Sequence, residues 1–307
     1  WGAGTTPQAR IYLHLLPLLH RKIEIKGVSV QAPLLDVILR EGAIERRKDA
    51  LTGVHKRIMQ RMPSLTINGG TLTITRPEEQ EPFLTVQEVT GNFTSRKGDK
   101  AGLELSFTLP GAERIAIRIA TTTKDEQYTS CSCLATGTGV QIEEIRALFH
   151  DVLGWSKTVQ TVFDIMREGR LSQIIFHGEG RNFEEALDFE RNVRVRGTLS
   201  RGTIVTPPGP LPLEEVSGEF EIEEAVLHCW DADVRLGKST AREGELVVGL
   251  ISKREAFHLD AIIDAAAEDV IHYLPRVLQE ENIRREIQNF QEAEGRGRGR
   301  LVLGENI

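Results

Sequence analysis

Apolar and polar residues alternate with a period of two through the first third of the chain. The pattern is clearest at 103–109 and 115–119, where leucine, isoleucine or phenylalanine occupies every second position. Successive side chains of a strand point to opposite faces, so this alternation predicts antiparallel strands with one apolar and one polar face. The segment LTINGGTLTIT, Leu65 to Thr75, is predicted to be a hairpin, because Asn-Gly-Gly supplies the positive φ of a tight turn.

Three other segments have the composition or the apolar spacing of helices. Residues 44–61 are polar and predicted to be partly helical, ending before Pro63. Two apolar stripes between Ile142 and Met166 predict a helix pair. A last helix is expected at 264–279, kinked or divided at Pro275.

Together these elements predict a mainly β fold of the α+β type, an elongated antiparallel sheet with a few capping helices. Three parts are expected along the chain: residues 1–138 form a β-meander, residues 139–200 hold the helix pair and connecting strands, and residues 201–307 form a second β-module with one helical segment.

The segment EGRGRGRLVLG, Glu294 to Gly304, is open to two interpretations. Three Gly-Arg pairs are typical of a flexible basic arm, yet Leu301 and Leu303 continue the same alternation. Counting back by two from the leucines places the glycines on the apolar side and the arginines opposite. A strand is therefore favoured over an arm.

The charge of the whole chain argues against nucleic acid as a partner. With 38 basic and 45 acidic residues the formal net charge is −7, and aromatic residues make up only 6%. Neither a field that attracts phosphate backbones nor a set of base-stacking platforms is expected. No run of about eighteen apolar residues is present to span a bilayer.

Two glycine-containing segments match nucleotide-binding motifs only in part. In both, a residue that the motif requires is missing. GKST, Gly237 to Thr240, lacks the glycine five positions earlier, where Ala232 stands, and it precedes a strand. GTGVQIEEI, from Gly137, has Ile142 in the place of the third glycine. A simple turn is the better interpretation of GKST.

The cysteines and acids do not form a recognisable metal or catalytic motif. Cys131 and Cys133 are too close in sequence for the usual structural zinc spacing. Cys229, Asp231 and Asp233 are predicted to share a strand face, but alternating acids are more often the wet face of a strand. We therefore expect no enzyme activity, no metal and no cofactor.

Several segments taken in order resemble one family. LPLLHRKIEIKGVSVQAPLLDVILREG (Leu16 to Gly42) is similar to the opening of AsmA-like proteins, and MPSLTINGGTLTIT (Met62 to Thr75) to the hairpin that follows it. The stretch from Val193 to Leu246 resembles a later module of the larger, YhdP-like members, and AEGRGRGRLVLG the glycine-alternating strand after it.

This resemblance implies a taco-like β-groove, apolar inside and polar outside, in the periplasm of Gram-negative bacteria. It implies transport of phospholipid between inner and outer membrane without a cofactor, a role like that of bridge-like lipid-transfer proteins. Phospholipid acyl chains and other envelope proteins are the implied partners, as is the inner membrane, through an N-terminal helix that this chain lacks. The expected groove residues are Leu72, Ile74, Leu103, Leu105, Phe107, Ile115, Ile117, Ile119, Leu246, Val248, Leu301 and Leu303.

Two other classes of protein remain open from the sequence. A structural or scaffolding protein of outer-membrane biogenesis would use the same alternation for a closed core, with partners at its edges and no lipid. An enzyme would require a convergent polar cluster in a pocket, which the sequence does not show. Alternation by itself does not separate a closed core from a lipid-filled groove.

Overall fold

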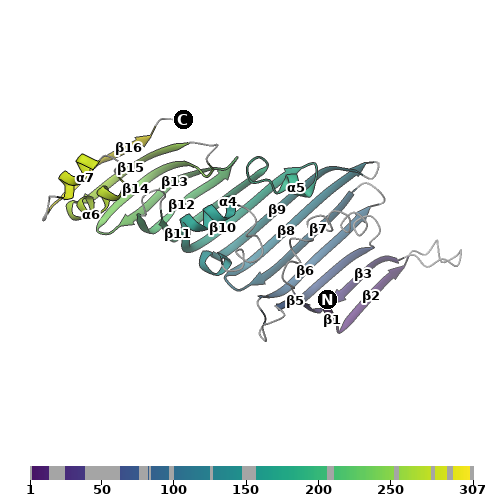
Figure 1. Ribbon diagram of the computed structural model, residues 1–307. Coiled ribbons are helices and arrows are strands. Elements are labelled where there is room, and N and C mark those ends of the chain that lie inside the picture. Colours follow the sequence, from purple (N-terminus) through teal and green to yellow (C-terminus); the bar gives the residue numbers. More distant parts are fainter. Residues whose placement is uncertain are drawn as a thin grey trace. The chain divides into compact units, whose positions relative to one another are not determined.

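The computed structural model describes residues 2–13, 25–38, 63–75, 82, 84–96, 100–124, 127–146, 157–205, 211–251, 256–277, 281–288 and 293–304. The predicted mainly β fold is confirmed: the described strands form one open, largely antiparallel sheet (Figure 1). Neighbours follow chain order from β5 to β16, with β1 beside β4, β4 beside β5, and β2 and β3 branching from β5. The predicted helix at 44–61 lies outside the described residues.

The strands of the first half are β1 Gly2–Thr5, β2 Gln8–Leu13, β3 Ile25–Gln31, β4 Leu34–Ile38, β5 Ser64–Thr75, β6 Leu84–Arg96, β7 Lys100–Leu109, β8 Ala112–Lys124 and β9 Gln127–Gln141. Those of the second half are β10 Met166–Gly180, β11 Val193–Val205, β12 Pro212–Glu223, β13 Val226–Leu236, β14 Ser239–Gly249, β15 Phe257–Ala266 and β16 Arg296–Gly304. The helices with described bounds are α4 Lys157–Ile165, α5 Phe183–Ala186, α6 Ala267–Val277 and α7 Glu281–Gln288.

The chain divides into two compact units. Unit 1 holds Trp1–Thr138 and Ile175–Asp188, and unit 2 holds Gly139–Ile174 and Phe189–Ile307. Strands β9 and β10 each contribute residues to both.

In unit 1 the predicted hairpin at Leu65 to Thr75 is wrong. These residues belong to the single strand β5, which pairs antiparallel with β6 over most of its length. Gly69 has a φ of +66°, but it forms a bulge rather than a turn. On its other side β5 pairs in parallel with both β3 and β4, which lie end to end beside it. These two pairings are the parallel exceptions in the otherwise antiparallel sheet of the described residues.

In unit 2 a line of bulges crosses four neighbouring strands. Each carries one charged residue at positive φ: Arg201 in β11, Glu215 in β12, Asp231 in β13 and Glu243 in β14. Between β11 and β12, β12 and β13, and β13 and β14 the pairing register shifts and then recovers, because both strands of each pair are bulged. Between β14 and β15 the register shifts once, at the bulge of β14, and stays shifted. Bulges bend strands and increase their twist, so these strands all change direction at one level.

The predicted helices are confirmed in part. Residues 142–146 are helical and α4 follows at Lys157–Ile165, but Met166, expected in the second helix, begins β10. Helix α6 includes Pro275, so the last helix is not divided there. Helix α7 was not predicted from the sequence, although it packs against α6.

The turn formed by the GKST segment joins β13 to β14, as predicted, and α6 fixes it. The carboxylate of Asp269 accepts hydrogen bonds from the backbone N–H of Lys238 (2.7 Å) and from the hydroxyl of Ser239 (2.6 Å). The Ser239 hydroxyl in turn accepts from the backbone N–H of Ala266. The turn thus holds the first turn of α6 against the end of β15.

The predicted strand at the C-terminal glycine-arginine segment is confirmed. β16 pairs antiparallel with β15 without a register shift, from His258↔Gly304 to Ala266↔Arg296. Arg296 and Arg300 bind Asp264 (2.8 Å) and Asp260 (2.7 Å) across the strand pair. Gly297 and Gly299 alternate with them and share the face of Leu301 and Leu303, as the alternation indicated.

Candidate functional site

A continuous apolar face is the dominant surface feature of unit 1. Residues that pair directly across strands point to the same face, so the register defines rows of side chains. One row crosses seven strands: Ile11, Val28, Leu65, Phe93, Leu103, Ile119 and Cys133. The next row holds Ala9, Val30, Ile67, Gly91, Leu105, Ile117 and Ala135.

The other candidate residues of unit 1 extend the same face. Phe107 pairs with Ile115, one step along from Leu105 and Ile117. Leu72 and Ile74 lie beyond the bulge in β5, opposite Val86 and Leu84 of β6. A second bulge, at Glu88 in β6, restores the register. Because the two bulges compensate each other, Leu72 and Ile74 stay on the apolar face.

These candidate side chains are only partly covered. Among the twelve residues predicted to line a groove, eleven are half-buried and Leu303 is exposed at 44%. Other members of the same face are buried, for example Phe93 at 6% and Cys133 at 7%. The face is therefore neither a dry core nor a fully wetted surface.

No second sheet covers this face within the part of the chain that the structure describes, because all its strands belong to one sheet. An apolar sheet face normally packs on another layer. The half-buried rows of unit 1 lack such a layer among the described residues, and they are the apolar surface on which a ligand or partner could lie.

Unit 2 has an apolar face built in the same way. One row runs through Gly197, Phe220, Cys229, Leu246, Leu259 and Leu303, and a second through Val195, Ile222, Leu227, Val248 and Phe257. Leu301 lies opposite Ala261, one step from Leu303. The four candidate residues of this unit thus occupy adjacent rows, together with several residues that the sequence did not single out.

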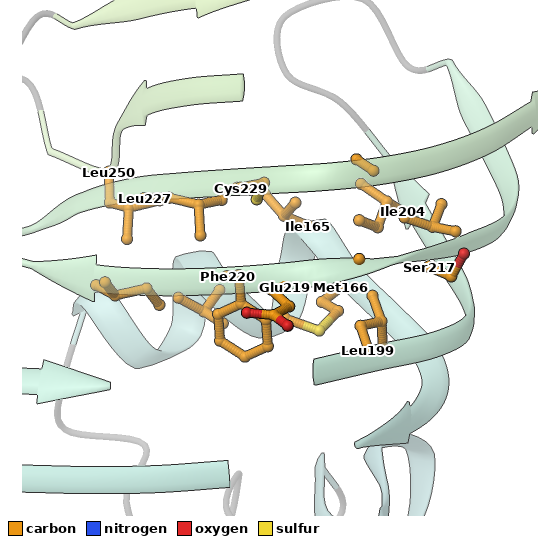
Figure 2. A pocket seen from close by; sticks show the side chains of 15 residues that line it. Ile165, Met166, Leu199, Ile204, Ser217, Glu219, Phe220, Leu227, Cys229 and Leu250 are labelled. Atoms are coloured by element: carbon orange, nitrogen blue, oxygen red, sulfur yellow. The ribbon is translucent and has the colours of Figure 1, made fainter. Parts of the chain in front are cut away.

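A small cavity of about 60 Å³ opens on this face beneath α4 (Figure 2). Val162 and Ile165 of α4 and Met166 lie on one side of it. The strands contribute the remaining lining residues: Leu199, Ile204, Val216, Ser217, Gly218, Glu219, Phe220, Ile222, Leu227, Cys229, Ala232 and Leu250. Nearly all are apolar, so the cavity suits a hydrocarbon group rather than a charged one.

Small residues form the part of this face where the bulges lie. A Cβ atom on Gly169 would come within 2.8 Å of the Cα of Gly202, and one on Gly244 within 3.0 Å of the carbonyl oxygen of Ala232. A Cβ on Gly218 would meet the Cα of Ala232 at 3.1 Å. Close approach of neighbouring backbones excludes side chains at these positions.

The three cysteines are free thiols on the apolar faces. Burial, together with the charge of Cys133, raises the pKa of Cys131 to about 11, and burial raises the pKa of Cys229 to about 12. Burial also raises the pKa of Cys133. All three are therefore neutral and unreactive near neutral pH.

The predicted common face of Cys229, Asp231 and Asp233 is wrong. Asp231 forms the bulge of β13, with a φ of +51°, and the alternation changes phase there. Cys229 and Ala232 line the cavity, whereas Asp233 is exposed and pairs with Ser217. Among the described residues, no group of three or more histidine, cysteine, aspartate or glutamate side chains is placed to hold a metal ion.

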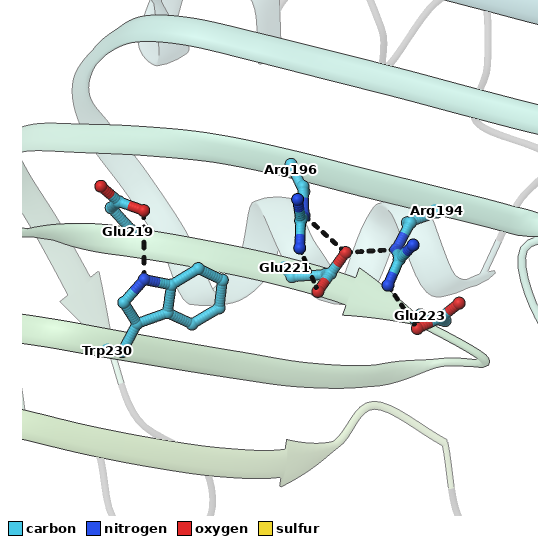
Figure 3. A network of polar contacts seen from close by, with 6 residues as sticks. All are labelled: Arg194, Arg196, Glu219, Glu221, Glu223 and Trp230. Atoms are coloured by element: carbon cyan, nitrogen blue, oxygen red, sulfur yellow. Dashed lines mark hydrogen bonds and ion pairs between the residues drawn. The ribbon is translucent and has the colours of Figure 1, made fainter.

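The opposite face of unit 2 is polar and held by ion pairs (Figure 3). Glu221 accepts from the Nε of Arg196 at 2.7 Å and also binds Arg194, which reaches Glu223 at 3.1 Å. Burial acts to raise the pKa of Glu221, but the hydrogen bonds and charges of the two arginines outweigh it and hold that pKa below its ordinary value. Trp230 donates its ring N–H to Glu219 at 3.1 Å.

Unit 1 has the same polarity across its sheet. Arg118 and Glu104, an exposed pair 2.8 Å apart, lie on the strands that carry Ile117, Ile119, Leu103 and Leu105 on the other face. Exposed pairs of this kind contribute little to stability. They do, however, make this face of the sheet charged and hydrated. Each unit is therefore apolar on one side of its sheet and charged on the other.

Sequence reasoning did not find the residues of the cavity. Leu199, Phe220 and Cys229 are members of strands that alternation could have aligned, but their meeting with α4 depends on contacts between distant segments. No helix in the described ranges is long and apolar enough to cross a membrane.

Comparisons of the chain with models of known protein families, with curated proteins and with solved structures find no match.

Proposed function

We propose that this chain is a non-enzymatic lipid-binding segment whose apolar sheet face holds the acyl chains of phospholipids. The observation that carries the proposal is the row structure of unit 1, in which apolar side chains of seven neighbouring strands adjoin one another and many of them, including the eight candidate residues of this unit, are only half-buried. A closed core would have buried them. The resemblance to AsmA-like proteins adds to the proposal the two membranes between which phospholipid is carried, the inner and the outer, and a periplasmic location.

The energetics favour an acyl chain as the occupant. Each methylene group that moves from water onto such a face contributes about 0.8 kcal/mol. A lipid that arrives from a bilayer already has its methylenes buried, so its transfer onto an apolar face is close to neutral. A surface that carries lipid needs this balance, because tight specific contacts would stop movement along it.

The separation of apolar and charged side chains also suits the acyl chains of a phospholipid. The apolar rows are free of charge, and the described ion pairs of Arg118 with Glu104 and of Arg196 with Glu221 lie on the opposite side. The acyl chains can therefore lie along the rows while the headgroup stays in water. The small cavity beneath α4 provides a deeper place for a short part of one hydrocarbon chain in unit 2.

The proposal is tested by purifying the chain from bacterial cells without detergent and recording its native mass spectrum, followed by lipid extraction. We expect phospholipid at a reproducible ratio to protein. A stable protein free of lipid would instead support the scaffolding alternative, in which partners bind the edges of the sheet and its polar surface.

A further inference from the structure

The outer edge of β16 combines features that favour pairing with another strand. Among the described residues β16 pairs only with β15, so one row of its backbone N–H and C=O groups lies at the open edge of unit 2. Free edges in soluble proteins are usually shortened, bent or charged along their length. β16 has nine residues, and its pairing with β15 shows no bulge.

The second half of β16 is apolar and exposed on both faces. Val302 is 52% exposed on the polar face, and Leu303 is 44% exposed on the apolar face. The neighbouring Phe257 of β15 is 50% exposed. A single exposed residue of this kind is ordinary, but two on opposite sides of one edge strand indicate a strand that is normally covered.

The first half of β16 has two further features: an arginine on one face and open space above two glycines on the other. Arg296 and Arg300 are bound to Asp264 and Asp260, whereas no hydrogen bond or ion pair joins Arg298 to another described residue. On the other face, a Cβ added to Gly297 or Gly299 would meet nothing within 4 Å. Bulky side chains from a neighbouring strand can fill such a gap over edge glycines.

We propose that β16 accepts an extended peptide segment as an additional antiparallel strand. The segment carries an acidic residue opposite Arg298 and bulky apolar or aromatic residues over Gly297 and Gly299. A second copy of this chain does not meet this requirement: in the antiparallel register that uses the whole strand, Arg300 would face the Arg300 of the other copy. Like charges opposite each other destabilise a strand pair.

The test uses a fluorescent nine-residue peptide, acetyl-Thr-Leu-Thr-Leu-Thr-Phe-Glu-Phe-Thr-amide, which places glutamate opposite Arg298 in that register. We expect saturable binding by fluorescence anisotropy. Hydrogen exchange should show new protection of those β16 amides that point to the open edge, which are every second one. The same peptide with lysine in place of glutamate is the charge control.

The Arg298→Glu variant should bind the glutamate peptide about three- to tenfold more weakly and regain affinity for the lysine peptide. Arg242→Glu, at an exposed arginine of β14, is the matched control and should bind as the unchanged chain does. Absence of protection in β16 at saturating peptide, or equal binding of both peptides, overturns the proposal. So does self-association of Arg298→Glu without peptide binding by the unchanged chain, because the arginine would then only keep copies apart.

Discussion

At the scale of single residues, the exposed fraction of an apolar side chain, more than its place in a row, indicates whether it packs the protein or contacts a ligand. Ile117 is half-buried and Val195 is 8% exposed, yet both are apolar strand residues on an apolar face. Only the second has neighbours on all sides. The account therefore assigns them different roles, Val195 in packing the protein and Ile117 in contacting the ligand.

This difference predicts separate outcomes for Ile117→Asp and Val195→Asp. A carboxylate at Ile117 remains hydrated, so the melting temperature by circular dichroism should change by only a few degrees while bound phospholipid is lost. A carboxylate at Val195 would be buried without a partner and should cost several kcal/mol of stability. If Ile117→Asp unfolds the chain as Val195→Asp does, the half-exposed rows are an ordinary core.

At the scale of elements, the bulges and the glycines beside them determine how neighbouring strands fit. Gly169 has a φ of +136°, and its Cα faces that of Gly202 on the next strand. Neither the conformation nor the space allows a side chain there. Gly297 and Gly299 of β16, in contrast, have open space on the same side of the backbone.

Gly169→Ala should therefore destabilise unit 2 by about 1–3 kcal/mol, from backbone strain and the clash with Gly202. Gly297→Ala, the matched control, should be neutral or stabilising by up to about 1 kcal/mol, because alanine restricts the unfolded chain more than glycine does. Urea unfolding of the two variants beside the unchanged chain measures both effects. Equal stability of the two variants would contradict the close backbone packing at the bulges.

The same elements show what alternation can and cannot predict. It predicted β16 with its glycines on the apolar side, because an unbroken strand keeps its phase. It failed in β5, where Asn68, Gly69 and Gly70 suggested a turn but form a bulge that is matched by a bulge at Glu88 in the next strand, β6. It failed again at Asp231, which moves Asp233 to the face opposite Cys229.

The candidate surface was partly predictable for the same reason. The twelve candidate residues do lie on apolar faces, since each belongs to a regular part of its strand. The cavity beneath α4 was not predictable, because it depends on the contact of Ile165 and Met166 with Leu199 and Phe220. Local periodicity contains no information on which distant segments meet.

At the scale of the molecule, the lipid-binding proposal depends on two units that each have an apolar and a charged side. Within the described residues no second sheet supplies the missing layer, and each unit separately presents adjoining apolar rows. Hydrocarbon chains supply that layer in the lipid-binding account. In the scaffolding account, the layer is supplied by protein.

The most direct test compares two neighbouring positions on opposite sides of β8. A photoreactive amino acid is placed at Ile117, on the apolar face, or at Arg118, on the charged face, in a chain produced in bacterial cells. After irradiation, mass spectrometry of the purified chain identifies what has been captured. The account predicts phospholipid cross-linked at Ile117 and none at Arg118; equal cross-linking at both positions, or protein alone captured at Ile117, would contradict it.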